Sequence, residues 1–223
     1  MPQEQKDVCP QCRQTFPRSE EEVVKQIRVW VDKGKAWAQT QLADQYRFGR
    51  GVPQSYEDAI RYLNMAIKQG DPIAMYDLAL MYTHGEGVAQ SFEISAELSA
   101  LAALQGHASA HYNLGVYYRD GTGVAPSYEK AIEMFSLAAK QGHANAQFNL
   151  GACYYDGHGV ARSNDMARKW WLKAALQEDE DAIQNLKMLE QEEKTTARRI
   201  LLMLLAPTVV VAVHVSRAWK RYR

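Results

Sequence analysis

The stretch from Ala110 to Gly142, AHYNLGVYYRDGTGVAPSYEKAIEMFSLAAKQG, decides the fold. In its first half, Leu114 and Tyr118 continue an apolar series with four-residue spacing, which is the spacing of one helical face. Gly121 and the glycine two residues later interrupt this helix, because glycine readily adopts the left-handed backbone of a tight turn. Ser127 is a typical N-cap for a second helix. The stretch therefore predicts two helices joined by a glycine turn.

The same pattern recurs every 36 residues, so it is an internal repeat. Four complete helix pairs are predicted, at 36–69, 70–105, 106–141 and 142–177. Single capping helices are expected at both ends, at 19–33 and 179–193, because a stack of helix pairs needs polar terminal surfaces. The fold class is therefore an all-α solenoid. Gly-x-Gly-Val begins at Gly49, Gly85, Gly121 and Gly157, and the N-cap serines are Ser19, Ser55, Ser91, Ser127 and Ser163.

These residues resemble the Sel-one-like repeat family, a relative of the tetratricopeptide repeat. The resemblance covers roughly residues 19–193 and implies a right-handed solenoid that works as a non-catalytic adaptor or scaffold. Two copies depart from the pattern, since Ala43 and Ala79 replace a glycine and Leu98–Ser99 replaces an aromatic residue. The best copy matches the pattern at Ala110, Leu114, Gly115, Tyr118, Gly121, Gly123, Val124, Lys130, Ala131, Ala138, Ala139 and Gly142.

The resemblance also implies where a partner would bind, because the first helix of each tetratricopeptide pair lines a concave groove. The position before the repeated leucine is expected to face this groove, and amides there can contact the backbone of an extended peptide. The alternative is that the asparagines bond within their own helix pair. The first row is Gln41, Asp77, Asn113, Asn149 and Asn185, and the row one turn further on is Arg47, Thr83, Arg119 and Tyr155.

A metal-like motif, Cys9-Pro10-Gln11-Cys12-Arg13, precedes the repeats. Cys9 and Cys12 could hold one side of a tetrahedral zinc ion, and the motif resembles the last ligand pair of a RING finger. Too few ligands precede it for a complete finger, so we expect a flexible tail over residues 1–18 and no metal site. The alternative function is a subunit of a ubiquitin-ligase or protein quality-control complex with a degenerate RING-like N-terminus.

Composition and charge exclude several classes of protein. The chain has 223 residues, with 26 basic and 26 acidic, and 47% of them are hydrophobic, which excludes a disordered polyelectrolyte. A neutral balance gives no support for nucleic-acid binding. Three cysteines cannot form a disulfide framework. We find no nucleophile motif and no phosphate loop, so we expect no enzyme activity and no cofactor.

The C-terminal segment has a different character. After an expected linker at 194–199, residues 200–215 read ILLMLLAPTVVVAVHV without a formal charge. Extended to Trp219, the run reaches about 30 Å as a helix, enough to span a bilayer. With a basic tip at 220–223, it predicts a cytosol-facing, tail-anchored protein of the mitochondrial outer membrane or endoplasmic reticulum. The alternative is a soluble cytoplasmic protein whose last helix covers the end of the solenoid.

Overall fold

The computed structural model describes residues 19–199. The cysteine pair Cys9 and Cys12 and the candidate anchor Ile200–Trp219 lie outside the described residues. The described chain is built of helices and contains no strand, which confirms the predicted all-α class. It divides into two compact units, one ending at His143 and the other beginning at Ala144.

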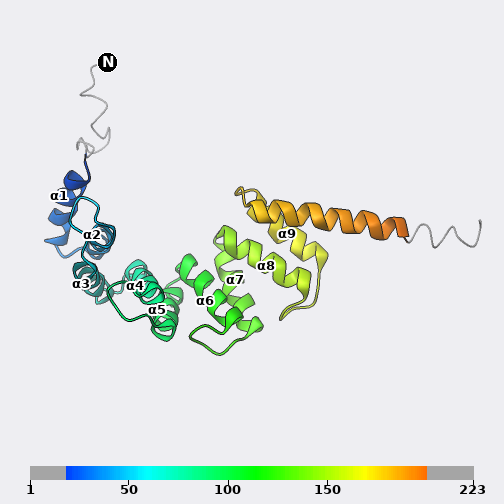
Figure 1. Ribbon diagram of the computed structural model, residues 1–223, viewed down its shortest axis with the longest axis horizontal. Coiled ribbons are helices and arrows are strands. Elements are labelled where there is room, and N and C mark those ends of the chain that lie inside the picture. The colour runs from blue at the N-terminus through cyan, green and yellow to red at the C-terminus, as the bar shows by residue number, and fades with distance from the viewer. Residues whose placement is uncertain (1–18, 200–223) are drawn as a thin grey trace, which may run out of the picture. The chain divides into compact units, whose positions relative to one another are not determined.

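The first unit consists of consecutive helices that each pack against the next (Figure 1). The capping helix α1 precedes three helix pairs, and in each pair the first helix packs most extensively against its own second helix. The bounds are α1 Glu20–Val31, α2 Ala36–Phe48, α3 Tyr56–Ile67, α4 Pro72–His84, α5 Phe92–Leu104, α6 Ala108–Asp120 and α7 Tyr128–Lys140.

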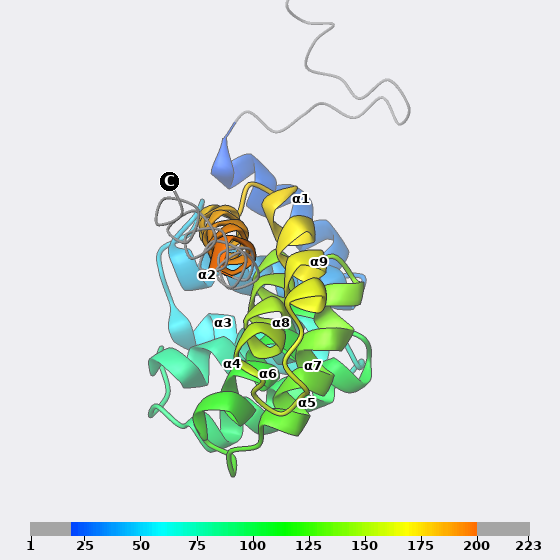
Figure 2. The ribbon, with the colours of Figure 1, turned by 90° about the vertical axis from the view of Figure 1, so that its right-hand side faces the viewer.

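The second unit contains the fourth pair and a C-terminal helix. Helix α8 spans Ala144–Asp156, α9 spans Asn164–Ala175, and a last helix runs from 180 to the end of the described chain at 199. Figure 2 shows this last helix, in orange, nearly along its axis and beside α9. It continues without a break through 194–199, the segment that we expected to be a linker. No glycine or proline stands there to end it, which explains the difference.

Serine caps start α1 and the second helix of every pair, as the sequence predicts. In each case the hydroxyl accepts a hydrogen bond from the backbone N–H three residues later and so satisfies a donor that the first turn leaves free. The five caps are Ser19, Ser55, Ser91, Ser127 and Ser163.

The glycine turns carry two different constraints. Gly121 ends α6 in the left-handed region, with φ of 69°, as predicted for a helix C-cap. Gly123 also has φ of 69°, and a Cβ there would collide with the carbonyl group of Phe92, at the start of the preceding pair's second helix. The second glycine of the motif therefore allows neighbouring pairs to approach closely.

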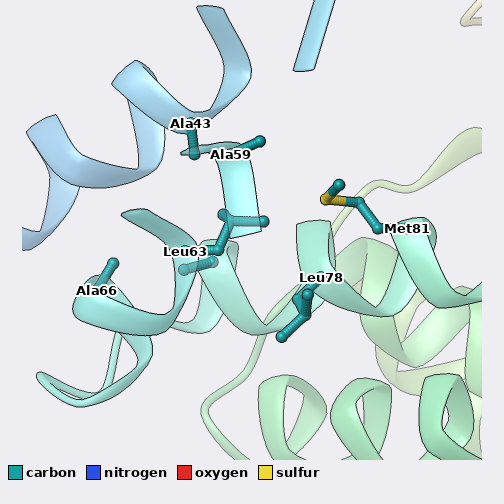
Figure 3. Packing of buried hydrophobic residues seen from close by; sticks show 7 residues of the cluster. Ala43, Ala59, Leu63, Ala66, Leu78 and Met81 are labelled. Atoms are coloured by element: carbon teal, nitrogen blue, oxygen red, sulfur yellow. The ribbon is translucent and has the colours of Figure 1, made fainter. Parts of the chain in front are cut away.

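In the first, third and fourth pairs, the core contains a small residue of the first helix and a larger residue of the second. Gly115 leaves room for the buried ring of Phe135, since a Cβ at this glycine would lie 2.6 Å from the ring. In the first pair the corresponding residues are Ala43 and Leu63, which belong to one buried cluster (Figure 3). The departures from the repeat pattern are therefore compensated in volume: where alanine replaces the glycine, a smaller side chain replaces the aromatic ring.

The second unit follows the same rule. Gly151 faces the buried indole of Trp171, which also donates a hydrogen bond of 3.1 Å to the carbonyl oxygen of Phe148. The C-terminal helix closes this core with Ala182 and Leu189, both fully buried. Within residues 19–199, none of the helices is both long enough and apolar enough to cross a membrane.

Candidate partner-binding groove

A cavity of about 450 Å³ opens on the first unit between α1, α2 and the start of α4. Gln41 and Asp77, the first two residues of the predicted groove row, line it together. Val23 and Ile27 of α1 form one wall. The volume lies within the range of ligand-binding clefts and suits one or two side chains of a partner.

The apolar part of the cavity is largely open to solvent. Trp37 of α2 is 47% exposed and Ile73 of α4 is 51% exposed, although both are large apolar residues. The ring of Trp37 also lies 5.9 Å from that of Trp30 in a tilted arrangement. Exposed tryptophan beside aliphatic residues is typical of binding surfaces, because the indole contributes much contact area at little entropic cost.

The polar part of the cavity is acidic. Asp44 forms an ion pair with Arg50. Asp71 caps α4 by accepting a hydrogen bond of 2.9 Å from the N–H of Ile73, and it accepts another of 2.8 Å from the hydroxyl of Thr40.

Asp77 differs from the other two carboxylates of the cavity. It has no hydrogen bond and no ion pair within the described residues. Burial raises the pKa of this carboxyl from 3.8 to about 6, and the negative charges of Asp44 and Asp71 act in the same direction. The positive charge of Arg47 opposes the rise. Asp77 is thus a partly desolvated acid for which the described chain supplies no direct partner.

The asparagines of the predicted row have partners inside the molecule. The amide of Asn113 donates to the hydroxyl of Tyr76, in the preceding pair, at a long distance of 3.4 Å. The amide of Asn149 donates to the carbonyl of Asn145, one turn earlier in α8, at 2.8 Å. The bond of Asn149 lies within its own pair, as the alternative considered from the sequence has it, whereas the bond of Asn113 reaches the preceding pair.

Two residues of the second predicted row lie in contacts between successive pairs. Arg47 is buried, and its Nε donates to Glu86, in the next glycine turn, at 2.5 Å. Thr83 lies within hydrogen-bonding distance of the hydroxyls of Ser95, at 2.7 Å, and Tyr117, at 2.8 Å. These side chains join neighbouring helices of the solenoid.

The other two residues of this row also have local partners. Arg119 donates from two nitrogens to the neighbouring carboxylate of Asp120, at 2.7 and 2.9 Å. The hydroxyl of Tyr155 donates to Glu192 of the C-terminal helix at 2.8 Å, and its ring lies 5.5 Å from that of Trp171. A ligand that binds the guanidinium of Arg119 or the hydroxyl of Tyr155 would have to compete with these internal hydrogen bonds.

Sequence reasoning missed part of the groove. Trp37, Asp44 and Asp71 line it, but they occupy variable positions of the repeat, so the 36-residue pattern carries no signal for them. Helix periodicity could have identified two of them, because Trp37 and Asp44 each lie about one turn from Gln41, on the same face. The apolar wall that α1 contributes depends on how this capping helix packs against the first pair, which the repeat pattern does not show.

Metal and thiol chemistry have little support in the described part of the chain. Residues 19–199 contain no group of three or more histidine, cysteine, aspartate or glutamate side chains placed to hold a metal ion. The cysteine in this range, Cys153, is buried in α8 and forms no disulfide.

Comparison with known protein families accounts for the repeats. The Sel1 repeat family matches residues 38–71, 72–107, 108–143 and 144–179. The chain belongs to the Sel1 repeat family. Sel1 repeat proteins are generally protein-interaction scaffolds and are typically non-catalytic, in agreement with the expectation from the sequence. The matched segments begin two residues after the boundaries predicted from the glycine period and keep the same length of about 36 residues.

Two solved structures are similar over most of the described chain. A Sel1 repeat protein from Oxalobacter formigenes is 36% identical, with a TM-score of 0.73, over 78% of this chain and 50% of that one. A protective antigen of uropathogenic Escherichia coli with this fold is 34% identical, with a TM-score of 0.74, over 76% of this chain and 36% of that one. This Sel1 repeat chain thus matches half or less of either protein. No curated protein sequence matches it significantly.

Proposed function

We propose that this Sel1 repeat protein is a non-catalytic adaptor that binds an extended segment of a partner protein along the first helices of its pairs. The cavity that Gln41 and Asp77 line together supports this most directly, because it combines exposed apolar walls with an unpaired polar side chain. Such a combination is typical of sites that bury a partner's side chain.

The proposed contact row continues from this cavity along the first helices. Asn113 uses one amide N–H in its long hydrogen bond to Tyr76, and an amide offers a second donor and a carbonyl acceptor to a peptide backbone. We include Arg119 in the row of the first unit and propose Asn149 and Tyr155 as contacts of the second unit, where a partner would share groups that already form hydrogen bonds. Arg47 and Thr83 would act indirectly, by holding neighbouring helices together.

Quantitative affinity purification with the full chain tests this proposal. Trp37→Ala removes an exposed apolar side chain from the groove, and Leu104→Ala removes one at the end of α5, where Leu104 is 84% exposed. We expect Trp37→Ala to lower the recovery of at least one partner about ten-fold, while Leu104→Ala retains it. Identical recoveries with both variants would contradict the assignment of the groove.

We also propose that Ile200–Trp219, outside the described residues, tethers the protein to the cytosolic face of the mitochondrial outer membrane or endoplasmic reticulum. Support comes from the uncharged run 200–215 and from the helix that precedes it. Residues 194–199 of this helix are all exposed, so they would act as a hydrophilic spacer of about 9 Å.

Alkaline carbonate extraction distinguishes a tether from a soluble protein. We expect the full chain to remain with the membrane pellet and a chain truncated after Lys194 to be released. Complete release of the full chain would contradict the tether, and a monodisperse full-length protein without detergent would favour the soluble alternative.

The cysteine pair supports a second candidate, a subunit of a ubiquitin-ligase or quality-control complex. Cys9-Pro10-Gln11-Cys12-Arg13 keeps the spacing of a zinc ligand pair, although it lies outside the described residues. Stoichiometric zinc in the purified full chain, lost on Cys9→Ser, would favour this candidate. If the purified protein contains no zinc, the RING-like candidate is contradicted and the adaptor function has no zinc finger.

A further inference from the structure

We propose that the groove formed by α1, α2 and α4 selects a basic side chain with apolar neighbours in the partner segment, and that Asp77 is the ion-pair partner of that side chain. This inference rests on the proposed adaptor function and adds the chemistry of the ligand. It commits to a lysine or arginine within a protein segment.

The charges around the cavity favour a cationic ligand. Asp44, Asp71 and Asp77 all line it, and none of the lining residues within 19–199 is basic. The nearby cation Arg47 is already bonded to Glu86, and Arg50 is bonded to Asp44. An arriving ammonium or guanidinium group would therefore meet a site with a net negative charge, the complementarity that selects partners at interfaces.

Asp77 gives the site a specific anchor. A partly desolvated carboxylate without a hydrogen-bond partner is costly, and a cation in contact with it would remove much of that cost. The other two groove carboxylates have partners, so Asp77 would gain most from a basic ligand. The equivalent residue of the next pair is the neutral Asn113, which bonds to Tyr76, so this feature is particular to the second pair.

The apolar walls favour a long basic side chain with apolar neighbours. Lysine and arginine carry a hydrocarbon stem that can pack on aliphatic and aromatic surfaces while the charged end reaches a carboxylate. Trp37 and Ile73 offer such surfaces, each about half exposed, and Val23 lies on the opposite wall. The neighbouring Trp30 already holds the ammonium of Lys33 4.4 Å from its ring centre, so indole–cation packing occurs at this end of the protein.

A degenerate peptide library tests the inference. The probes are N-acetylated, C-amidated octapeptides of random sequence, with arginine, lysine, glutamine or glutamate fixed at the fourth position. The full chain is compared with Asp77→Asn, with Trp37→Ala and with Glu97→Gln, which neutralises an exposed carboxylate on α5. We expect the arginine and lysine pools to be retained at least five-fold better than the glutamine pool, with apolar residues enriched at flanking positions.

The variants separate this inference from the proposed function. We expect Asp77→Asn to abolish the preference for basic pools, Trp37→Ala to weaken retention of every pool and Glu97→Gln to change neither. If Trp37→Ala weakens retention but Asp77→Asn keeps the preference for basic pools, Asp77 is not the ion-pair partner. The assignment of the groove as the binding site would then still hold. Retention that neither variant changes would overturn the groove itself, and with it the proposed function.

The pH dependence of binding provides an independent readout. The charged groups around Asp77 are Asp44 and Arg47 on α2 and Asp71 at the start of α4, and α1 contributes apolar side chains. Because the pKa of Asp77 is about 6, most of its charge is lost at pH 5. We expect affinity for a selected basic peptide to fall about ten-fold from pH 7.5 to pH 5, and Asp77→Asn to remove most of this dependence. The same pH dependence in Asp77→Asn would contradict the inference.

Discussion

The second and third helix pairs share one backbone pattern but differ in how completely their polar and apolar groups are matched. In the third pair, the ring of Phe135 fills the space that Gly115 leaves, and Asn113 has a hydrogen-bond partner. In the second pair, Ser99 takes the place of the ring and Asp77 takes the place of the asparagine.

The second pair therefore keeps groups that lower its own stability. The hydroxyl of Ser99 is buried without a hydrogen-bond partner within the described residues, and Asp77 is a partly buried carboxylate without one. Groups of this kind persist in proteins when function needs them or when their cost is tolerated. Asp77 lies among the residues that line the groove and Ser99 does not, so we propose a binding role for Asp77 alone.

The largest expected effect is the loss of the ring in the third pair. Phe135→Ala should lower the free energy of unfolding by about 3 to 5 kcal/mol, because the fully buried side chain would leave a cavity. Urea unfolding followed by circular dichroism measures the change. Leu137→Ala, at a residue 37% exposed on the same helix, should cost less than about 1 kcal/mol. Equal costs for the two variants would show that the ring is not central to this pair.

A smaller effect is expected where the glycine itself is replaced. Gly115→Ala should cost about 2 kcal/mol, because the new Cβ would lie 2.6 Å from the ring of Phe135 and must displace it. In a Phe135→Leu background, which reproduces the alanine–leucine combination of the first pair, the same change should cost less or become favourable. A double-mutant cycle measures this coupling. Additive effects would contradict the volume compensation between the two helices.

Neutralising the groove carboxylate should have the opposite sign. Asp77→Asn, which makes the second pair resemble the third, should stabilise the free protein by about 1 to 2 kcal/mol at pH 7.5, less than the full pKa shift converts to because the group is partly exposed. Because the pKa of Asp77 is higher in the folded state, protonation of this carboxyl favours folding of the wild type. This contribution is complete below pH 3.8 and is lost as pH rises through about 6. The gain from the substitution should therefore shrink as pH falls from 7.5 to 4.5.

Chemical unfolding at these two pH values measures the effect, with Glu97→Gln as a control that should show no pH-dependent difference. If Asp77→Asn destabilises the protein, the carboxylate stabilises the fold, and its lack of a partner is no argument for ligand binding. Stabilisation combined with weaker binding of basic peptides is the result that a binding role requires.

The smallest expected effect concerns the unpaired hydroxyl. Ser99→Ala should raise the free energy of unfolding by about 1 kcal/mol, since it removes a buried polar atom without a partner and leaves almost the same volume. Thermal unfolding measures it, and Ser95→Ala is the matched control. Ser95 is equally buried but bonds to Thr83 and Tyr117, so its replacement should destabilise the protein. Losses of similar size in both variants would show that Ser99 has a partner.

The sequence by itself determined the helix pairs and the ends of their helices, although not the end of the last helix. Serine N-caps and left-handed glycines act through backbone groups within about four residues, and the 36-residue period repeats this local chemistry, so both are visible without a structure. The sequence also indicated which helix face carries Gln41 and Asp77. It placed the end of the last helix too early, because no local signal ends that helix before residue 199.

Only the tertiary structure decided which of the predicted groove residues keep an unpaired polar group. The bonds of Asn113 to Tyr76 and of Arg47 to Glu86 join residues more than 30 positions apart, and the 36-residue pattern assigns the same row to both bonded and unbonded side chains. Asp77 became distinct from its row because helix packing buries it without supplying a donor. Burial and pairing depend on what neighbouring helices bring to a position, and that is information that periodicity does not contain.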